Sequence, residues 1–241
     1  MRVLVIGDSC KDIFVYCKVE RFCPEAPVPV LNVKDSTENG GMSKNVQKNV
    51  ERLNVHCDLI TNDNWEKLTK ARYVHRESNH MFLRIDGEDR ADHVDLSKIC
   101  YDYDAIIISD YNKGFLTELD IEEICKNHPM VFIDTKKVLG RWADNAKYIK
   151  INHTEYTHSL PHLTDYLKTK VIHTMGERGA ELNGKIYPVK PVDVKDASGA
   201  GDTFMAALVV KYLETKRIDR AIKFANECAR TVVQHRGVVT T

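Results

Sequence analysis

Short apolar runs alternate along the chain with segments whose apolar residues recur at helical spacing. Residues 2–6 and 105–109 are almost entirely apolar, which is typical of strands buried on both faces of a sheet. Residues 43–53 instead place their apolar side chains on one face of a helix. This order of strands and helices predicts a mostly parallel sheet with helices on its faces. Further strands are expected at 58–61, 130–134, 148–151 and 171–174, a hairpin at 180–189, and helices at 117–126, 199–213 and 218–235.

Two regions interrupt this alternation of strands and helices. Residues 13–20 and 30–33, separated by a proline-rich stretch, alternate between apolar and polar positions, and so do 72–75 and 81–85. A period of two predicts strands with one exposed face, so we expect four antiparallel strands outside the parallel sheet. A small sheet that projects from an α/β body often serves as a lid over a ligand site or as an interface.

Composition and charge exclude several classes of function. The 241 residues are 43% hydrophobic and 29% charged, with 35 basic and 35 acidic side chains. No basic block stands out, so we expect no nucleic-acid partner. No apolar run approaches the ~20 residues that span a bilayer, so we expect no membrane partner. The seven cysteines form no Cys-x-x-Cys pair, and we expect reduced thiols in a cytoplasmic protein.

The clearest candidate for chemistry is the segment 196–202, Asp-Ala-Ser-Gly-Ala-Gly-Asp, which precedes an apolar helix. Glycines at the start of a helix allow close backbone approach, and the free N–H groups there attract an anion such as a phosphoryl group. A carboxylate beside such a hole, Asp202, fits a base that takes a proton from an attacking hydroxyl. The pattern alone equally fits a glycine-rich loop before an Asp-capped helix.

The same segment resembles the signature of the ribokinase-like (phosphofructokinase-B type) carbohydrate kinases. Four further segments are similar to those of the D-glycero-D-manno-heptose 7-phosphate kinases within that family: Pro-Glu-Ala-Pro-Val-Pro-Val at 24–30, Arg-Ile-Asp at 84–86, Ser-Asp-Tyr-Asn-Lys-Gly at 109–114 and Ile-Asp-x-Lys at 133–136. The resemblance runs from residue 2 to about 240. It implies a ribokinase-like three-layer αβα sandwich forming one domain, 1–241, with lid strands within about 12–36 and 71–90. We expect no nucleotidyltransferase domain after it.

The resemblance also implies the reaction. ATP, with Mg²⁺, would phosphorylate a sugar hydroxyl, and in the heptose branch the product is the 1,7-bisphosphate. Asp202 would be the general base, and the backbone of Gly199, Ala200 and Gly201 would form the anion hole. Such a transition state needs positioning and charge stabilisation more than covalent help. A monovalent-cation requirement is left open.

Other positions match the family residue by residue. On the ATP side these are Asn152, Glu155, Thr174, Gly176, Gly179 and Asn226, with Glu155 acting on magnesium through water. On the sugar side they are Asp12, Gly41 and Asn45, with Arg84, Asp110 and Lys113 as further candidates for substrate contacts. A phosphorylated substrate needs paired basic donors. Without the resemblance, Asn152 and Glu155 fit a helix cap and an exposed first-turn acid better.

The chain also departs from the family pattern. It is several tens of residues shorter, with a strand–helix unit missing near 62–68, so we expect one edge of the sheet to be thin or covered by a partner chain. We also expect a homodimer formed through the lids. Two alternatives stay open: another sugar or nucleoside kinase of the family, and a pseudokinase that binds sugar or nucleotide without turnover. A dinucleotide site would need Gly-x-Gly-x-x-Gly after the first strand, which Gly7-Asp8-Ser9-Cys10 lacks.

Overall fold

A large sheet forms the centre of the computed structural model, which describes residues 1–235. Its strands are β1 (Arg2–Gly7), β4 (His56–Ile60), β7 (Ala105–Asp110), β8 (Val131–Thr135), β9 (Tyr148–Asn152), β10 (Val171–Thr174), β11 (Ala180–Leu182) and β12 (Lys185–Tyr187). Their order in space is β12-β11-β10-β9-β8-β7-β1-β4. The six strands from β4 to β10 are parallel, and only the hairpin β11–β12 runs antiparallel. The mostly parallel α/β fold predicted from the sequence is confirmed.

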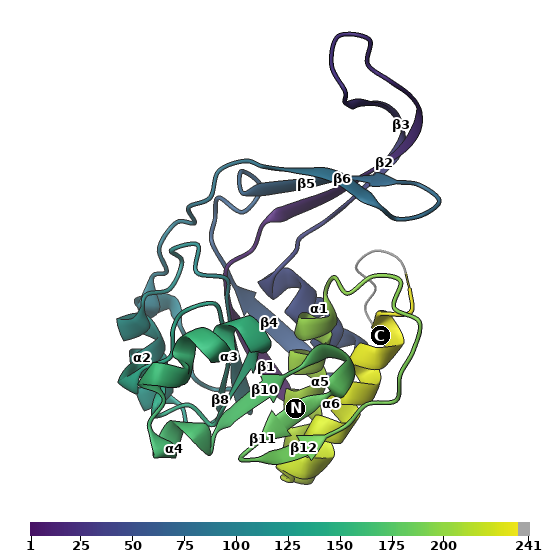
Figure 1. Cartoon of the computed structure of the whole chain (residues 1–241). Coiled ribbons are helices and arrows are strands. Elements are labelled where there is room, and N and C mark those ends of the chain that lie inside the picture. Colours follow the sequence, from purple (N-terminus) through teal and green to yellow (C-terminus); the bar gives the residue numbers. More distant parts are fainter. Residues whose placement is uncertain (236–241) are drawn as a thin grey trace.

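Helices cover both faces of this sheet (Figure 1). One layer contains α1 (Ser43–Arg52), α5 (Ala200–Thr215) and α6 (Ile218–Val232), and the other contains α2 (Glu118–Asn127), α3 (His153–Ser159) and α4 (Asp165–Lys168). Short 3₁₀ turns connect these elements at η1 (Leu96–Lys98), η2 (Arg141–Ala143), η3 (Leu160–His162) and η4 (Gly176–Arg178).

Successive side chains of each central strand enter different cores. In β1, Val3 and Val5 pack against the α1–α5–α6 layer, whereas Leu4 and Ile6 pack against the α2–α3–α4 layer. All four are at most 1% exposed. Because neighbouring side chains of a strand point to opposite faces, a strand buried on both faces must be apolar throughout. This explains the uninterrupted apolar runs at 3–6 and 105–108.

The second sheet projects from the body as a lid (Figure 1). It consists of β2 (Lys11–Phe22), β3 (Pro29–Asn39), β5 (Thr69–His75) and β6 (Met81–Asp86), in the order β3-β2-β5-β6. The expectation that all four strands are antiparallel is wrong, because β2 and β5 pair in parallel. The reason is topological: β2 continues from β1, β5 continues from β4, and β1 and β4 are themselves parallel neighbours.

The predicted short segment connects β4, the edge strand of the large sheet, directly to the lid. Residues 61–68 form turns rather than a strand and helix. They also hold the end of β1: the Thr61 hydroxyl donates to the Gly7 carbonyl at 2.7 Å, and the Asn62 side chain accepts from the Ser9 N–H at 2.8 Å. The domain prediction extends over 236–241, which lie outside the described residues. Within residues 1–235, no helix has the length and apolar character to cross a bilayer.

Candidate functional site

Polar residues gather where the parallel strands end. Asp8 follows β1, Asp110 ends β7, Asp134 lies near the end of β8, and Asn152 and Thr174 end β9 and β10. The carboxyl ends of parallel strands meet at one edge of a sheet, and ligands bind there in open α/β folds. The lid strands β2 and β5 leave the body at this same edge, so the candidate site lies between the sheet and the lid.

Asp202 lies in the first turn of α5, at the centre of this edge. Gly199 precedes the helix in the left-handed conformation, with φ of 79°, which glycine adopts without a steric cost. The carboxylate of Asp202 accepts a hydrogen bond from the Tyr111 hydroxyl at 2.8 Å and a longer one, 3.4 Å, from the Asn45 amide. The side chain is held between the two core layers and is 3% exposed.

Burial raises the pKa of Asp202 to about 6, with Asp134 adding to the effect and the Tyr111 hydrogen bond opposing it. The carboxylate is therefore ionised at neutral pH but much more basic than an exposed aspartate. Burial and the Asp202 charge raise the pKa of Tyr111 well above its usual value, so Tyr111 stays a neutral donor. This is the state that a general base for a hydroxyl group requires.

A cavity of about 800 Å³ opens beside Asp202. Its lining brings together nine predicted site residues besides the base: Gly199, Ala200, Gly201, Asn152, Thr174, Gly176, Gly179, Asn226 and Asp110. Gly176 and Gly179 have φ of 61° and 85°, and a Cβ on Gly179 would lie 2.1 Å from the Tyr187 carbonyl oxygen. The cavity has the size and the apolar walls typical of a small-molecule site.

The predicted anion hole faces this cavity at the start of α5. The first N–H groups of a helix have no partner within the helix and are free to bind an anion. Of the three predicted donors, the Ala200 N–H makes a long hydrogen bond, 3.3 Å, to the Ala197 carbonyl. The helix start and the buried carboxylate of Asp202 therefore line the same cavity, as the predicted anion hole and base require.

Asn152 and Glu155 form a capping box at the start of α3. The Asn152 side chain accepts from the Glu155 N–H at 3.0 Å, and Glu155 accepts from the Asn152 N–H at 2.7 Å. Contrary to the interpretation from the residues alone, Glu155 is buried, at 7% exposure, and its carboxylate also pairs with Lys136. The capping box thus fixes Asn152, which lines the large cavity, whereas Glu155 lies behind it.

This arrangement bears on the predicted magnesium ion. Within residues 1–235, no group of three or more His, Cys, Asp or Glu side chains could hold a metal ion directly. Both Glu155 oxygens already accept hydrogen bonds from Asn152. The residues therefore fit an ion that is held by nucleotide phosphates and waters, with Glu155 and Asn152 orienting those waters.

Three predicted sugar-side residues lie outside the cavity lining, and one of them, Asn45, contacts the base. A Cβ on Gly41 would be 3.3 Å from the Asp12 Cβ, which places the glycine directly against Asp12. Asp12 is 6% exposed and pairs with Arg72 of the lid strand β5. Asn45, in α1, joins this group to Asp202 through its amide.

The other three sugar-side candidates are not all together. Arg84 pairs with Asp86 at 2.5 Å on β6, and Lys113 pairs with Asp89, so both are beside the lid. Asp110 instead lines the cavity side, where it is 1% exposed and accepts two hydrogen bonds from Lys137 at 2.8 and 3.0 Å.

A group of basic residues lies under the lid. Burial is the main cause that lowers the pKa of Lys70 and of Arg72. Lys113 and Arg84 lower the pKa of Lys70 further, and Arg84 lowers that of Arg72, so the four cations are close together. Arg72, Arg84 and Lys113 each have a carboxylate partner. Lys70 has none among the described residues, and its Nζ lies 5.6 Å from the ring centroid of Tyr111.

Several residues of the site were not predicted from the sequence. Tyr111 and Lys136 are in segments already matched to the family, so position in a motif was a signal for them. Asp8 accepts hydrogen bonds from the N–H groups of Tyr111 and Lys113 at 2.6 and 3.2 Å and so fixes their loop. Lys70 and Lys150 belong to no matched motif, and only the folded chain identifies them.

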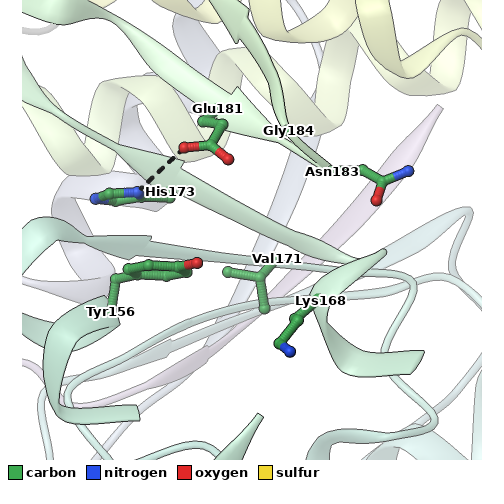
Figure 2. Close-up of a pocket in the computed structure, with 7 residues that line it drawn as sticks. All are labelled: Tyr156, Lys168, Val171, His173, Glu181, Asn183 and Gly184. Atoms are coloured by element: carbon green, nitrogen blue, oxygen red, sulfur yellow. Dashed lines mark ion pairs between the residues drawn. The ribbon is translucent and has the colours of Figure 1, made fainter. Parts of the chain in front are cut away.

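A second, smaller cavity of about 190 Å³ lies outside this site, between α3, β10 and the β11–β12 hairpin (Figure 2). Its buried His173 stacks on Tyr156, with ring centroids 4.2 Å apart, and lies 3.8 Å from the Glu181 carboxylate. None of the predicted site residues lines it. His173 also contacts His153 of the larger cavity, 3.0 Å between ring nitrogens.

Comparison with known proteins finds a matching family and similar proteins. The model of a family described as pfkB family carbohydrate kinase matches residues 51–241. The Bifunctional protein HldE of Helicobacter pylori strain J99 is 29% identical, over 98% of this chain and 63% of that protein. HldE of Histophilus somni is 27% identical, over 99% and 61%. The chain thus spans less than two thirds of the length of these relatives.

Solved structures agree at the level of the fold. The ribokinase of Thermotoga maritima matches with a TM-score of 0.75 and 17% identity, covering 98% of this chain and 94% of that one. A nucleoside kinase of Methanocaldococcus jannaschii matches with a TM-score of 0.74 and 15% identity, covering 98% and 93%. The alignment with the Helicobacter protein runs over 293 residues although this chain has 241, so that relative has segments that this chain lacks.

Proposed function

Because the chain belongs to the pfkB family of carbohydrate kinases, we propose that it phosphorylates a sugar that already carries a phosphate group. The substrate proposed is D-glycero-D-manno-heptose 7-phosphate, and the product is the 1,7-bisphosphate. ATP is the phosphoryl donor. This choice within the family rests on the heptose-kinase segments of the sequence and on the similarity to HldE proteins.

The observation that carries the proposal is the unpaired Lys70. Burial lowers the pKa of its ammonium group, and Lys113 and Arg84 lower it further, while the Asp86 carboxylate, which is paired with Arg84, opposes them. A partly buried cation among other cations is costly unless an anion binds it. Its position over the ring of Tyr111, which contacts Asp202, puts that anion on the sugar side of the base. A phosphate on the sugar is the anion that fits.

The chain's own residues account for the transfer. Asp202 takes the proton of the attacking hydroxyl, while Tyr111 and Asn45 hold its carboxylate in place. The N–H groups at the start of α5 stabilise the charge on the phosphoryl group. The cavity and its glycine turns hold the nucleotide, and Asn152 and Glu155 orient the waters of Mg²⁺, which would neutralise charge on the phosphates when bound.

We also propose that the lids of two copies pair to form a homodimer. Alternate residues of β6, Met81, Leu83 and Ile85, are 49%, 41% and 53% exposed, and Val33 on β3 is 59% exposed. Exposed apolar side chains at alternate positions of β6, an edge strand of the lid, are of the kind found at interfaces. Leu83→Asp should yield a monomer in light scattering, and Ile186→Asp, at a 58% exposed site on β12, should leave the mass unchanged.

The experiment that tests the function compares matched pairs of substrates. ADP release is measured with magnesium-ATP and heptose 7-phosphate, free heptose, fructose 6-phosphate, fructose and a nucleoside. The proposal predicts the highest kcat/KM for heptose 7-phosphate and at least about tenfold lower values for the unphosphorylated sugars, since a charge-assisted contact is worth about 1.5–3 kcal/mol.

Lys70→Met should remove this preference for the phosphate, and Lys67→Met, at an exposed position nearby, should retain it. A higher kcat/KM for another sugar phosphate would contradict the heptose assignment alone. A preference for a free sugar or a nucleoside would contradict the phosphorylated substrate. Binding of ATP without turnover on any member of the panel would favour the pseudokinase.

A further inference from the structure

Lys150 is a buried cation at the phosphate end of the large cavity. It belongs to β9, two residues before Asn152, and is 6% exposed. Its Nζ donates to the Asp134 carboxylate at 2.7 Å. Lys136, Lys190 and Arg230 also line the cavity, but all three are more exposed than Lys150. Of the lysines and arginines that line it, Lys150 is thus the one whose charge is removed from water.

The ammonium group of Lys150 is not fully satisfied by the protein. It has three N–H donors, and the bond to Asp134 is its one hydrogen bond among residues 1–235. Burial opposes its charge, but the carboxylates of Asp134, Glu155 and Asp202 outweigh burial and raise the pKa of Lys150. A charged, buried ammonium with two free N–H groups is expensive unless a further acceptor binds it.

Lys150 lies directly against the helix start that forms the anion hole. A Cβ on Gly201 would be 2.8 Å from the Lys150 Nζ, closer than atoms can pack without displacement. Gly201 therefore leaves room for the ammonium group, and the next residue is the base, Asp202. An acceptor that contacts the first-turn N–H groups of α5 and lies in line with Asp202 is also within reach of Lys150.

We propose that Lys150 is a second catalytic residue, which donates a hydrogen bond to a non-bridging oxygen of the phosphoryl group during its transfer. Asp134 is its positioning residue. In the step, the bond between the γ-phosphorus and the oxygen of the leaving ADP breaks and its electron pair stays on ADP. The sugar oxygen forms the new bond to phosphorus and its proton passes to Asp202. Lys150 keeps its own proton throughout.

This inference rests on phosphoryl transfer, the first part of the proposed function, and not on the identity of the sugar. The test uses the full chain with Mg²⁺, ADP, and ADP with aluminium fluoride, which mimics the group in transit. Lys150→Met should lower kcat by about 10²–10³, the range for loss of one preorganised donor to a transition state. Its affinity for ADP should change by less than about threefold, whereas its affinity for ADP–aluminium fluoride should fall by about 10²-fold or more.

A second variant distinguishes a loss of catalysis from a loss of folding. Lys150→Met leaves Asp134 buried and unpaired, so Lys150→Met/Asp134→Asn restores a neutral pair. The double variant should unfold at the wild-type temperature yet stay about 10²-fold slow. Lys170→Met, which removes hydrogen bonds to the carbonyls of Asp144 and Ala146 outside the site, should keep the wild-type preference for the fluoride complex.

Recovery of kcat to within about threefold of wild type in the double variant would overturn the proposal, because Lys150 would then only balance the charge of Asp134. Equal losses of affinity for ADP and for ADP–aluminium fluoride would overturn it as well. In a third outcome, the affinities of the variants for ADP–aluminium fluoride differ as expected while no sugar phosphate of the panel is turned over. The assignment of Lys150 then holds, and only the sugar proposed above is wrong.

Discussion

The two halves of the site rely on different parts of the chain, one on the backbone and the other on charged side chains. The cavity side uses backbone turns: Gly176 and Gly179 have positive φ, Gly199 precedes α5 in the left-handed conformation, and the walls are mostly apolar. The lid side uses charged side chains that come from the lid strands and the loop after β7 and are paired with one another. The first half depends on backbone shape and the second on charge balance, and Asp202 lies where the two meet.

Asp202→Asn should have the largest effect, because it removes the group that serves both halves. We expect kcat to fall by about 10²–10⁴, the usual contribution of a general base. The amide retains an acceptor for Tyr111, so the dissociation constants for ATP and for the sugar, measured by calorimetry, should change by less than about threefold. Asp193→Asn, at an exposed position before the same motif, is the matched control. Full activity in Asp202→Asn would rule out this base.

Gly179→Ala should affect only the cavity half. The new Cβ would lie 2.1 Å from the Tyr187 carbonyl oxygen, at a φ of 85° that a non-glycine residue adopts only under strain. We expect KM for ATP to rise about tenfold or more and KM for the sugar to stay within a factor of about two. Gly184→Ala is matched, since φ is 75° but no atom lies within 4 Å. An equal rise in both KM values would show that the halves are not independent.

The pH dependence of kcat/KM should report the ionisation of Asp202, which lies where the two halves meet. Burial raises the pKa of Asp202 to about 6, and only the ionised form accepts a proton. The rate constant should therefore be constant from pH 7 to 8 and fall about tenfold for each pH unit below 6. A profile that stays flat down to pH 5 would show that the base is less buried than the structure indicates.

Asp202→Asn should also change stability, with a sign opposite to its effect on activity. A folded-state pKa of about 6 against 3.8 when unfolded means that ionised Asp202 destabilises the fold, fully above pH 6 and not at all below about 4. Asp202→Asn should thus be more stable than wild type at pH 8, by at most about 3 kcal/mol, in urea unfolding. The difference should shrink as the pH falls to 5, and exposed Asp63→Asn should show no such trend. Destabilisation of Asp202→Asn at pH 8 would contradict this interpretation.

The sequence by itself determined those parts of the molecule whose constraints are local. Strands buried on both faces must be apolar throughout, so β1 and β7 were predicted within one or two residues. A turn with positive φ favours glycine, and a helix start that binds an anion needs free N–H groups. The local pattern of segment 196–202 therefore indicates both α5 and the cavity half of the site, although the roles of its residues remain predictions.

Only the tertiary structure decided the features that depend on distant residues. The parallel pairing of β2 with β5 follows from the positions of β1 and β4, which no local pattern records. Tyr111 and Asp202 are 91 residues apart in the chain, yet a hydrogen bond joins them. Lys70 and Lys150 look like ordinary lysines of alternating strands. Folding removes water, their hydrogen-bond partner in the unfolded chain, from both ammonium groups. A charged group acquires a shifted pKa or an unmet hydrogen bond only once the folded chain surrounds it.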